Sequence, residues 1–512
     1  MLTRMKRSRA RAHPGVWRRG ACVPFFALMT ISAHAAGNLS IEPSINTRAT
    51  YSDGRNGTNG ADSDYMFEIT PSIRLARDRG ALTGGFTFSL RNAYYIDAPE
   101  SNTSFVTFQG NGAYEIIDDT FFIEARGNVS RQDRSLFSAQ SDSDTFNTSA
   151  SNETRLFSLS PRLQFRLGST GEGQLRLEET WFSGGNGVRG SRRERSWVLN
   201  LSDGSAFGPL GWFADYRRNS TNYDDNVRET TRESGRLGLS YRVSPRFTLR
   251  STVGREKNDF NPNDVQSKTT YGFGGDWNPT DRTSLTAFVE ERLYGRGYDL
   301  QFRHRSRKTV WSLSFTRDYV ASSSLVSTSA NGYYYDYFYD LFAAQVPDPV
   351  QRDQVTRAFL AAIGLDALPQ EISYVSESQS LRQAVRGSVV IKGIRNTVTV
   401  SLFRTQDERL SSDVVIAGDD FDGNSVIVRS GGGVSWTRQL SPKTSLNSSI
   451  NLSDTKGSGS NAREQKLTTF RVGLTRRLGV KANGALIYSH TKREGDIAGD
   501  ENQITASLGF RF

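Results

Sequence analysis

Apolar and polar side chains alternate at every second position in many segments of the chain between Asn38 and Phe512. The segment 157–167 reads FSLSPRLQFRL, and segments 86–91 and 237–243 read FTFSLR and LGLSYRV in the same way. Successive side chains of a β-strand point to opposite faces of the sheet, so this period of two predicts strands with one apolar and one polar face. Clusters of Gly, Asn, Asp and Ser between the segments predict turns and loops.

The predicted connections between strands alternate in length. Short ones lie at 78–80, 118–119, 244–245, 279–281, 392–393 and 440–443, and long polar ones at 52–64, 133–153, 184–193, 255–267, 407–424 and 453–465. Outer-membrane barrels have short periplasmic turns and longer outer loops. The alternation therefore predicts an all-β fold, a transmembrane antiparallel up-and-down β-barrel of about 22 strands with both ends in the periplasm. We find no repeat of fixed period, which argues against a propeller or solenoid.

The C-terminal segment is the most regular of the predicted strands. Ile504, Ala506, Leu508, Phe510 and Phe512 alternate with small or polar residues up to the last position of the chain. An aromatic-ended terminal strand resembles the signal that outer-membrane proteins present to the barrel-assembly machinery. We expect Leu508, Phe510 and Phe512 to form this signal, which makes that machinery a partner.

Composition agrees with a sheet that has one apolar and one wet face. Hydrophobic residues make up 36% of the chain and the mean hydropathy is −0.53, yet there are 30 Phe, 19 Tyr and 47 Gly. No run of about 18 apolar residues could form a transmembrane helix. A spanning strand needs only about 9–11 residues, half of them apolar.

The first 35 residues have the three parts of a secretory signal peptide. A basic stretch at 4–19 precedes a short apolar run at 21–31, and residues 33–35 form an A-x-A cleavage site. We therefore expect a signal peptide at 1–35 and a barrel at 36–512 in the outer membrane of a Gram-negative bacterium, in contact with its lipid.

Cleavage of this segment changes what the bulk composition implies. It removes seven basic residues from a chain of net charge +10, and with them the main support for a nucleic-acid partner. It also removes Cys22, the only Cys, which excludes a disulfide framework or a Cys-based metal site in the mature chain.

The segment 318–376 interrupts the predicted rhythm of strands and is expected to be one long outer loop. A loop of this length inside a compact fold is usually functional or disordered. It contains a tyrosine-dense run at 333–339. Tyrosine clusters are common at membrane interfaces, which favours a position at the rim for these side chains.

Within this loop the sequence predicts a short helix at 350–363. Asp348 is suited to cap its first turn, Pro349 to occupy the first helical position, and Gly364 to end it. Phe359 lies on the apolar face of the predicted helix. The helix either folds into the mouth as a constriction, or acts as a lid or docking surface, or packs on the rim and only stabilises the barrel.

The mature chain resembles in outline the PEP-CTERM system-associated outer-membrane proteins, a family found with exosortase and exopolysaccharide loci, and only its central third carries specific similarity. The similar stretches are YGRGYDL at 294–300, HRSRKTVWSLSFTRD at 304–318, the loop run from Leu341-Phe342 to Pro347-Asp348-Pro349, and Phe359-Leu360. The resemblance implies a setting in the export of envelope polysaccharide and surface proteins more than it implies a mechanism.

The mature chain offers little for catalysis or metal binding. It holds only two histidines, His304 and His490, which we expect near opposite ends of the barrel, and it has no G-x-S-x-G element. The segment 419–424 reads DDFDGN and resembles part of a calcium loop, but no glutamate closes it at the required spacing. We interpret it as a solvated acidic outer loop. We expect neither an enzyme nor a cofactor.

The polar faces of the predicted strands carry many arginines. Because a charge on the lipid face costs about 2–4 kcal/mol near the midplane, we expect these side chains to line the lumen. Four glutamates, Glu68, Glu124, Glu178 and Glu290, fall on the same faces. The lumen-lining candidates are Arg74, Arg91, Arg126, Arg162, Arg166, Arg236, Arg242, Arg303, Arg382, Arg386 and Arg471.

The excess of arginine over acid on these faces predicts a cationic lumen that favours anions. The alternative is a structural Arg–Glu network that fills the interior. Three functions stay open: a channel or scaffold for the export or assembly of anionic exopolysaccharide or surface proteins, a general or anion-preferring diffusion porin, and a barrel enzyme that acts on envelope lipid or polysaccharide.

Overall fold

The computed structural model describes residues 39–54, 63–77, 79–133, 135–138, 151–184, 191–203, 207–223, 229–259, 265–320, 378–410 and 419–512. The predicted signal peptide at 1–35 and the predicted loop helix at 350–363, with Asp348, Pro349, Phe359 and Gly364, lie outside these ranges. Among the residues described, no helix is both long and apolar enough to span a membrane.

The described residues form 22 strands and one short 3₁₀ helix. The strands are β1 (Leu39–Ser52), β2 (Asp64–Arg77), β3 (Leu82–Tyr95), β4 (Thr103–Ile117), β5 (Phe121–Asp133), β6 (Ser151–Arg166), β7 (Gly171–Gly184), β8 (Arg192–Asp203), β9 (Leu210–Tyr223), β10 (Glu229–Ser244), β11 (Phe247–Asn258), β12 (Gln266–Thr280), β13 (Thr283–Arg292), β14 (Gly295–Arg305), β15 (Thr309–Val320), β16 (Ser380–Lys392), β17 (Asn396–Arg409), β18 (Val426–Ser441), β19 (Thr444–Ser458), β20 (Glu464–Arg477), β21 (Ala482–Gly495) and β22 (Gly499–Arg511). The 3₁₀ helix, η2 (Pro99–Ser101), lies between β3 and β4.

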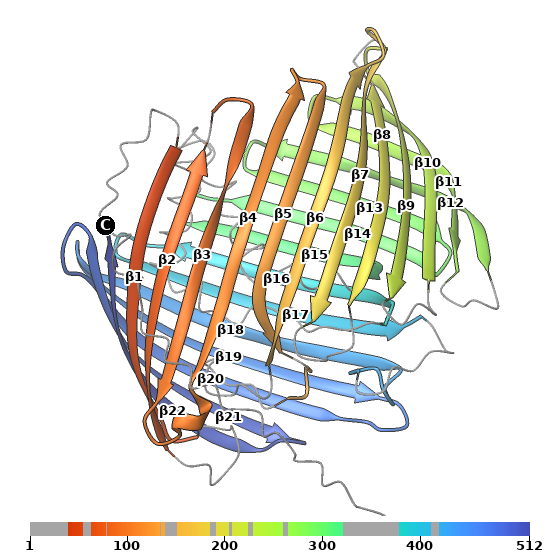
Figure 1. The fold of residues 1–512 in the computed structure, drawn as a ribbon. Coiled ribbons are helices and arrows are strands. Elements are labelled where there is room, and N and C mark those ends of the chain that lie inside the picture. The colour runs from red at the N-terminus through yellow and green to blue at the C-terminus, as the bar shows by residue number, and fades with distance from the viewer. Residues whose placement is uncertain are drawn as a thin grey trace, which may run out of the picture.

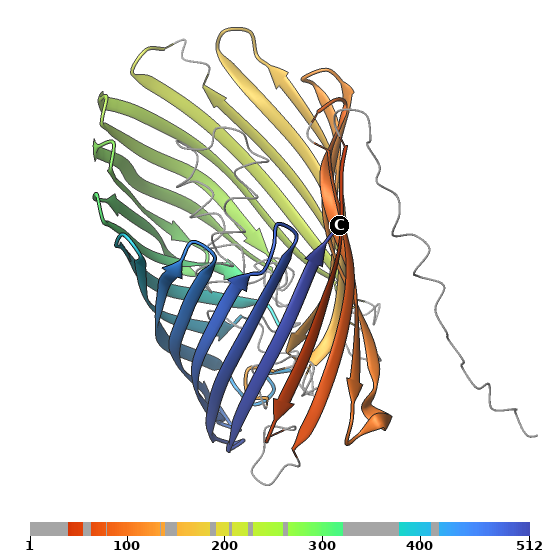
Figure 2. The same cartoon turned by 90° about the vertical axis from the view of Figure 1, so that its left-hand side faces the viewer.

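The strands close into one antiparallel barrel. Each strand pairs with its neighbours in the sequence, and β1 pairs with β22 over nine positions, from Ser44 opposite Arg511 to Ser52 opposite Gln503. Figures 1 and 2 show the ring of strands from two sides, with the first strand beside the last. The predicted fold of about 22 strands in an up-and-down barrel is confirmed. Closure leaves no free strand edge in the hydrocarbon region, where an unpaired backbone group would be costly.

Most connections alternate in length as predicted, with exceptions such as the two-residue outer turn between β13 and β14, and several strands extend further than the sequence indicated. β11 continues to Asn258 and β12 begins at Gln266, so their connection is much shorter than the predicted loop 255–267. Likewise, β19 and β20 extend into the predicted loop 453–465, and β15 continues to Val320. The added residues are mostly polar on both faces, because a strand that emerges from the membrane no longer needs an apolar side.

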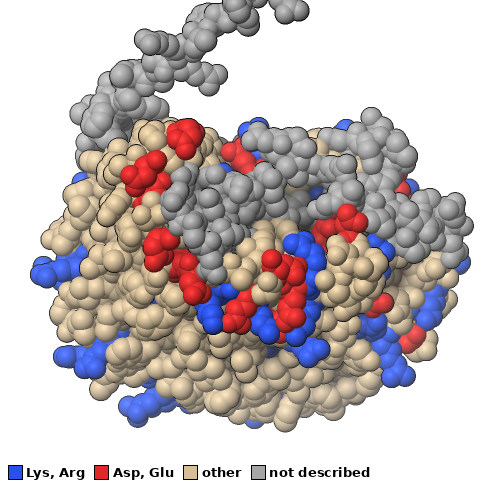
Figure 3. Space-filling model, turned by 90° about the horizontal axis from the view of Figure 1, so that it is seen from below, with Lys and Arg blue, Asp and Glu red and all other residues tan. Residues whose placement is uncertain are grey.

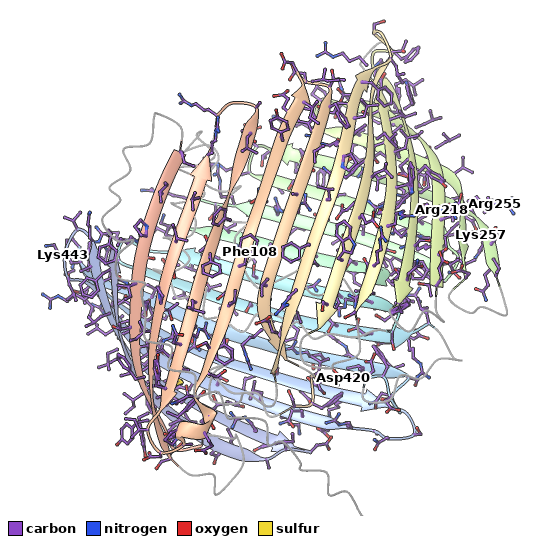
Figure 4. The ribbon with its side chains drawn as sticks, viewed as in Figure 1. Phe108, Arg218, Arg255, Lys257, Asp420 and Lys443 are labelled. Carbon is purple, nitrogen blue, oxygen red and sulfur yellow. The ribbon has the colours of Figure 1, made fainter. Side chains whose placement is uncertain are left out.

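The outward face of the barrel is apolar and carries packed aromatic rings. Phe86, Phe108 and Phe157 lie in a row, with ring centroids 5.8 and 6.5 Å apart. Between them, Gly127 on β5 has no side chain, and a Cβ there would come within 2.6 Å of the Phe108 ring. The glycine thus lets aromatic rings from the neighbouring strands cover its backbone. Figure 4 shows Phe108 about midway along β4, at the height expected for contact with lipid.

The inward face is polar and largely buried. Thr50, Ser52 and Glu68 are each at most 3% exposed, whereas large apolar side chains of the outward face such as Phe67 are over 40% exposed. This inverted distribution, with polar groups inside and apolar groups outside, is that of a barrel whose solvent is lipid. The protein is accordingly located in the outer membrane, with its short turns at the periplasmic end.

Candidate functional site in the lumen

The strand register places the predicted arginines on the inward face. The register can be followed from strand to strand: Arg126 lies opposite the buried Ser158, Arg236 opposite Asp215, and Arg382 opposite Asp407. All eleven candidates, Arg74, Arg91, Arg126, Arg162, Arg166, Arg236, Arg242, Arg303, Arg382, Arg386 and Arg471, share this face. The two histidines lie on the outward face, with His304 beside Thr283 and His490 beside Asn502.

Several of these arginines are held by carboxylates. Arg162 donates to Glu124 at 2.7 Å, and Arg176, from the next strand, donates to the other oxygen of the same carboxylate at 2.7 Å. Arg382 forms a two-pronged pair with Asp407 at 2.6 and 2.9 Å. These pairs link neighbouring strands, or in the case of Arg176 a strand two positions away, and cancel part of the positive charge on the wall.

Arg236 begins a larger group of charges toward the outer end of the wall, on strands β9 to β15. It donates two hydrogen bonds to Asp215, at 2.9 and 3.0 Å, and a third to Glu290 at 3.1 Å. Arg292 lies 3.6 Å from Glu290 and joins this group to Glu256, with which it shares contacts of 2.8 and 3.2 Å.

The same group continues through Glu256 to β15. Glu256 is 1% exposed and also accepts from Arg232 at 3.2 Å, while Arg292 reaches Asp318 at 3.1 Å. The Arg232 guanidinium lies 4.3 Å from the centre of the Tyr319 ring. We call Asp215, Arg232, Arg236, Glu256, Glu290, Arg292 and Asp318 the outer network. The outer network contains four acids and three arginines. Its carboxylates therefore bind its own guanidinium groups, which are not available to a solute.

Aromatic rings pack against the outer network at the turn formed by residues 293–294. Tyr294 packs edge-on against Tyr319 with centroids 4.6 Å apart, and its hydroxyl donates to the Arg317 carbonyl at 2.8 Å. Burial raises the pKa of the Tyr294 hydroxyl above its ordinary value, with the nearby carboxylate of Asp318 acting in the same direction. The tyrosine therefore stays neutral and acts as a packing and hydrogen-bonding group.

Of the outer network, the sequence predicted Arg236 and Glu290 but not Asp215, Arg232, Glu256, Arg292 or Asp318. Glu256 lies inside the predicted loop 255–267, so the sequence pattern did not assign it to the inward face of a strand. Arg292 and Arg232 continue the same alternation as Glu290 and Arg236, and extension of those two strands would have found them.

A second inward feature is a cavity of about 450 Å³ in the wall formed by β5 to β10, which we call the wall pocket. It is lined by polar side chains such as Asn200, by the predicted Arg126, and by Arg217. Neither arginine forms an ion pair with a described acid. Two acids also line the pocket: Glu178, which has no ion pair with a described base, and Glu194, which pairs with Arg192. The wall pocket thus presents guanidinium groups that an incoming anion could engage bidentately.

The outer mouth is crossed by a contact between loops from far-apart strands. Ser135 and the backbone amide of Leu136, just after β5, both donate to the carboxylate of Asp420, just before β18, the amide at 2.8 Å. Twelve strands separate β5 from β18 in a ring of 22, so these loops lie on nearly opposite sides of the barrel. We call residues 135–138 and 419–424, with the side chains packed between them, the mouth clamp.

Apolar packing stabilises the mouth clamp. Phe137, Phe421 and Ile427 are each at most 1% exposed and form one cluster with Leu136. Arg463, from the β19–β20 loop, lies 4.7 Å from the centre of the Phe137 ring and donates to the Phe137 carbonyl. Burial of these rings on folding contributes about 25 cal/mol per Å² of apolar surface removed from water.

The segment 419–424 is therefore not a solvated acidic loop, and that prediction is wrong. Asp420, Phe421 and Asn424 are each at most 3% exposed, since the clamp encloses them. Burial raises the pKa of the Asp420 carboxyl to about 6, while the hydrogen bond from Ser135 opposes the shift. Among the residues described, no cluster of His, Cys, Asp and Glu has a geometry that could hold a metal ion.

Charges of both signs lie on the face of the molecule that points downward in Figure 1. Figure 3 shows acidic and basic side chains next to one another on that face, around residues that are not described. This interleaving agrees with the paired charges of the outer network, and differs from a single-sign field that would attract one kind of ion from a distance.

Comparison with known proteins gives the fold but no family. No family model and no curated protein matches the chain. Two solved structures of the FrpB iron transporter from Neisseria meningitidis (F5-1 variant) match at a TM-score of 0.51; the apoprotein form is 10% identical and the other 9%. Each match covers 93% of this chain, and 82% and 83% of the transporter. The siderophore receptor PirA from Pseudomonas aeruginosa, at 8% identity and a TM-score of 0.46, is too distant to support an argument.

Identities this low show a shared fold alone. The two structures that share the fold are named as those of an iron transporter. By fold and by location, the chain is a 22-stranded β-barrel of the Gram-negative outer membrane.

Proposed function

We propose that the barrel is an outer-membrane conduit for anionic, hydrophilic molecules, and that its cargo is an exopolysaccharide in export or assembly. The observation that carries the proposal is the wall pocket, where Arg126 and Arg217 face the lumen without acidic partners among the described residues. At Arg162, Arg236 and Arg382, by contrast, carboxylates neutralise the guanidinium groups. A carboxylated or sulfated chain could therefore bind at the wall pocket without displacing an internal acid.

The mouth clamp fits this proposal as a means of control. A contact that joins loops from opposite sides of the barrel narrows the outer exit, and its hydrogen bonds and aromatic packing can separate without unfolding any strand. The resemblance of the central third of the chain to exopolysaccharide-associated barrels adds support for the class of cargo.

Uptake of an anionic iron chelate is a second candidate function. Two observations favour it: the fold is shared with structures named as iron transporters, and the wall pocket, at about 450 Å³, has the size of a small ligand site. A compact chelate would occupy the pocket as a discrete ligand, whereas a polymer would pass along it.

Ion selectivity in planar bilayers tests the proposal. The reconstituted barrel should prefer anions, and Arg126→Gln with Arg217→Gln should reduce that preference, most clearly at low salt. The matched control is Arg382→Gln with Asp407→Asn, which removes a charge pair from the wall without changing the net charge. Cation selectivity of the unmodified barrel would refute an anion conduit. Oligogalacturonate that blocks the current more strongly than ferric citrate would favour the polymer over the chelate.

A further inference from the structure

The periplasmic end of β16 to β22 holds a cavity of about 750 Å³, which we call the periplasmic groove. Three hairpin turns form it, those between β16 and β17, β18 and β19, and β20 and β21, together with the end of β22. Figure 4 shows Lys443 of the middle turn at the edge of the barrel where Figure 1 places the C-terminus, at the opposite end of β18 from Asp420.

The charge of the periplasmic groove has one sign. Its lining includes seven basic residues and no Asp or Glu. None of the seven forms an ion pair with a described acid. They are Lys392, Arg395, Lys443, Arg476, Arg477, Lys481 and Arg511. Like charges held this close repel one another, so the arrangement is unfavourable unless an anionic group offsets it.

The groove opens toward the lumen rather than toward lipid. Gln439, Ser445 and Thr475 of its wall lie on the inward face, in register with one another, and Ser445 and Thr475 share a hydrogen bond of 2.6 Å. Arg477 and Arg511 lie on the same inward face, so headgroups of the inner leaflet do not supply the missing negative charge to them. Arg476 lies on the outward face of β20.

Apolar side chains stand beside the charges. Ile394 and Val480, at the tips of two of the turns, are fully exposed, and both line the groove. The lining has no Phe, Tyr or Trp on which a sugar ring could stack. Exposed aliphatic groups next to a field of basic residues fit a protein surface with acidic and apolar side chains better than they fit a carbohydrate.

We propose that the periplasmic groove docks an acidic segment of a periplasmic partner protein, with apolar residues of that segment resting on Ile394 and Val480. The acidic side chains would engage Lys443, Arg477 and Lys481, and the apolar contacts would set the register. The partner would thereby be held at the periplasmic opening of the lumen, close to any molecule that enters the barrel there.

Binding of defined peptides to the full mature barrel in detergent tests this proposal. A fluorescent 12-residue peptide with the repeat Glu-Glu-Leu should bind, and added salt should weaken it. Lys443→Gln, Arg477→Gln and Lys481→Gln together should weaken binding by about tenfold or more. Ile394→Ser with Val480→Ser should lower the affinity for this peptide to that of a Glu-Glu-Ser peptide, whose own affinity should not change.

The matched control removes the same charge from the other end of the barrel. Lys456→Gln, Lys466→Gln and Lys492→Gln alter exposed side chains on the outer parts of β19, β20 and β21, and should leave peptide binding unchanged. Unaltered heat-modifiable migration shows that each variant is folded. Equal binding by the groove variant and the unmodified barrel would overturn the proposal. So would oligogalacturonate binding as tightly as the Glu-Glu-Leu peptide with no effect of the Ile394 and Val480 changes, which would make the groove a carbohydrate site.

Discussion

The outer network and the periplasmic groove place the same type of side chain on the same inward face with opposite consequences. In the outer network Arg292 is 8% exposed and contacts three carboxylates, those of Glu256, Glu290 and Asp318. In the groove, Arg477 and its basic neighbours meet no described acid. An arginine enclosed by acids contributes to the structure of the wall, whereas an arginine without them is available to a ligand. Amino-acid composition alone does not distinguish these two kinds of arginine.

The largest effect should follow from removing one carboxylate of the outer network. Glu256→Gln leaves Arg232 and Arg292 facing a neutral amide in a buried position, and loss of one partner of a buried ion pair costs about 3–5 kcal/mol. We expect a marked fall in the temperature at which the barrel loses its compact form, measured by heat-modifiable migration and by circular dichroism.

The control for that experiment is Glu464→Gln, which removes an exposed carboxylate paired with Lys456 and Lys466. Such surface pairs contribute little, so its unfolding temperature should not move. Equal effects of the two variants would contradict the distinction between enclosed and available charges.

The mouth clamp should respond to pH through Asp420. Its pKa is raised to about 6 by burial, with Asp419 adding to the shift and Ser135, Leu136 and Arg463 opposing it. The closed clamp then binds a proton more readily than the open one, so closure is most stable below about pH 4 and weakens as pH rises through about 6. Conductance should rise between about pH 5 and about pH 7.5.

Asp420→Asn should remove that pH dependence and keep the clamp closed, because the amide needs no proton to stay neutral. Phe137→Ala should open the clamp at every pH, since the fully buried ring leaves a cavity. Conductance that is unchanged in Phe137→Ala would show that the clamp does not limit flow.

The barrel itself was predictable because lipid enforces the alternation that reveals it. Each strand must show apolar groups on one side wherever it crosses the membrane, and the eleven predicted arginines lie on the other side for the same reason. Prediction failed where that constraint ends: Glu256 and Asp318 lie on strand ends assigned to loops. The contact of Leu136 with Asp420 joins residues 284 positions apart, and no local pattern carries that information.

The smallest effect should come from single charges in the periplasmic groove, and it bears most directly on the comparison. Lys443→Gln should leave the unfolding temperature unchanged or raise it slightly, because it relieves repulsion and breaks no described ion pair. Affinity for the Glu-Glu-Leu peptide should fall by only a few-fold, since the remaining six basic side chains still attract it. A lower unfolding temperature without a change in peptide affinity would mean that Lys443 stabilises the barrel wall as Arg292 does. The basic side chains of the two regions would then both have a structural role.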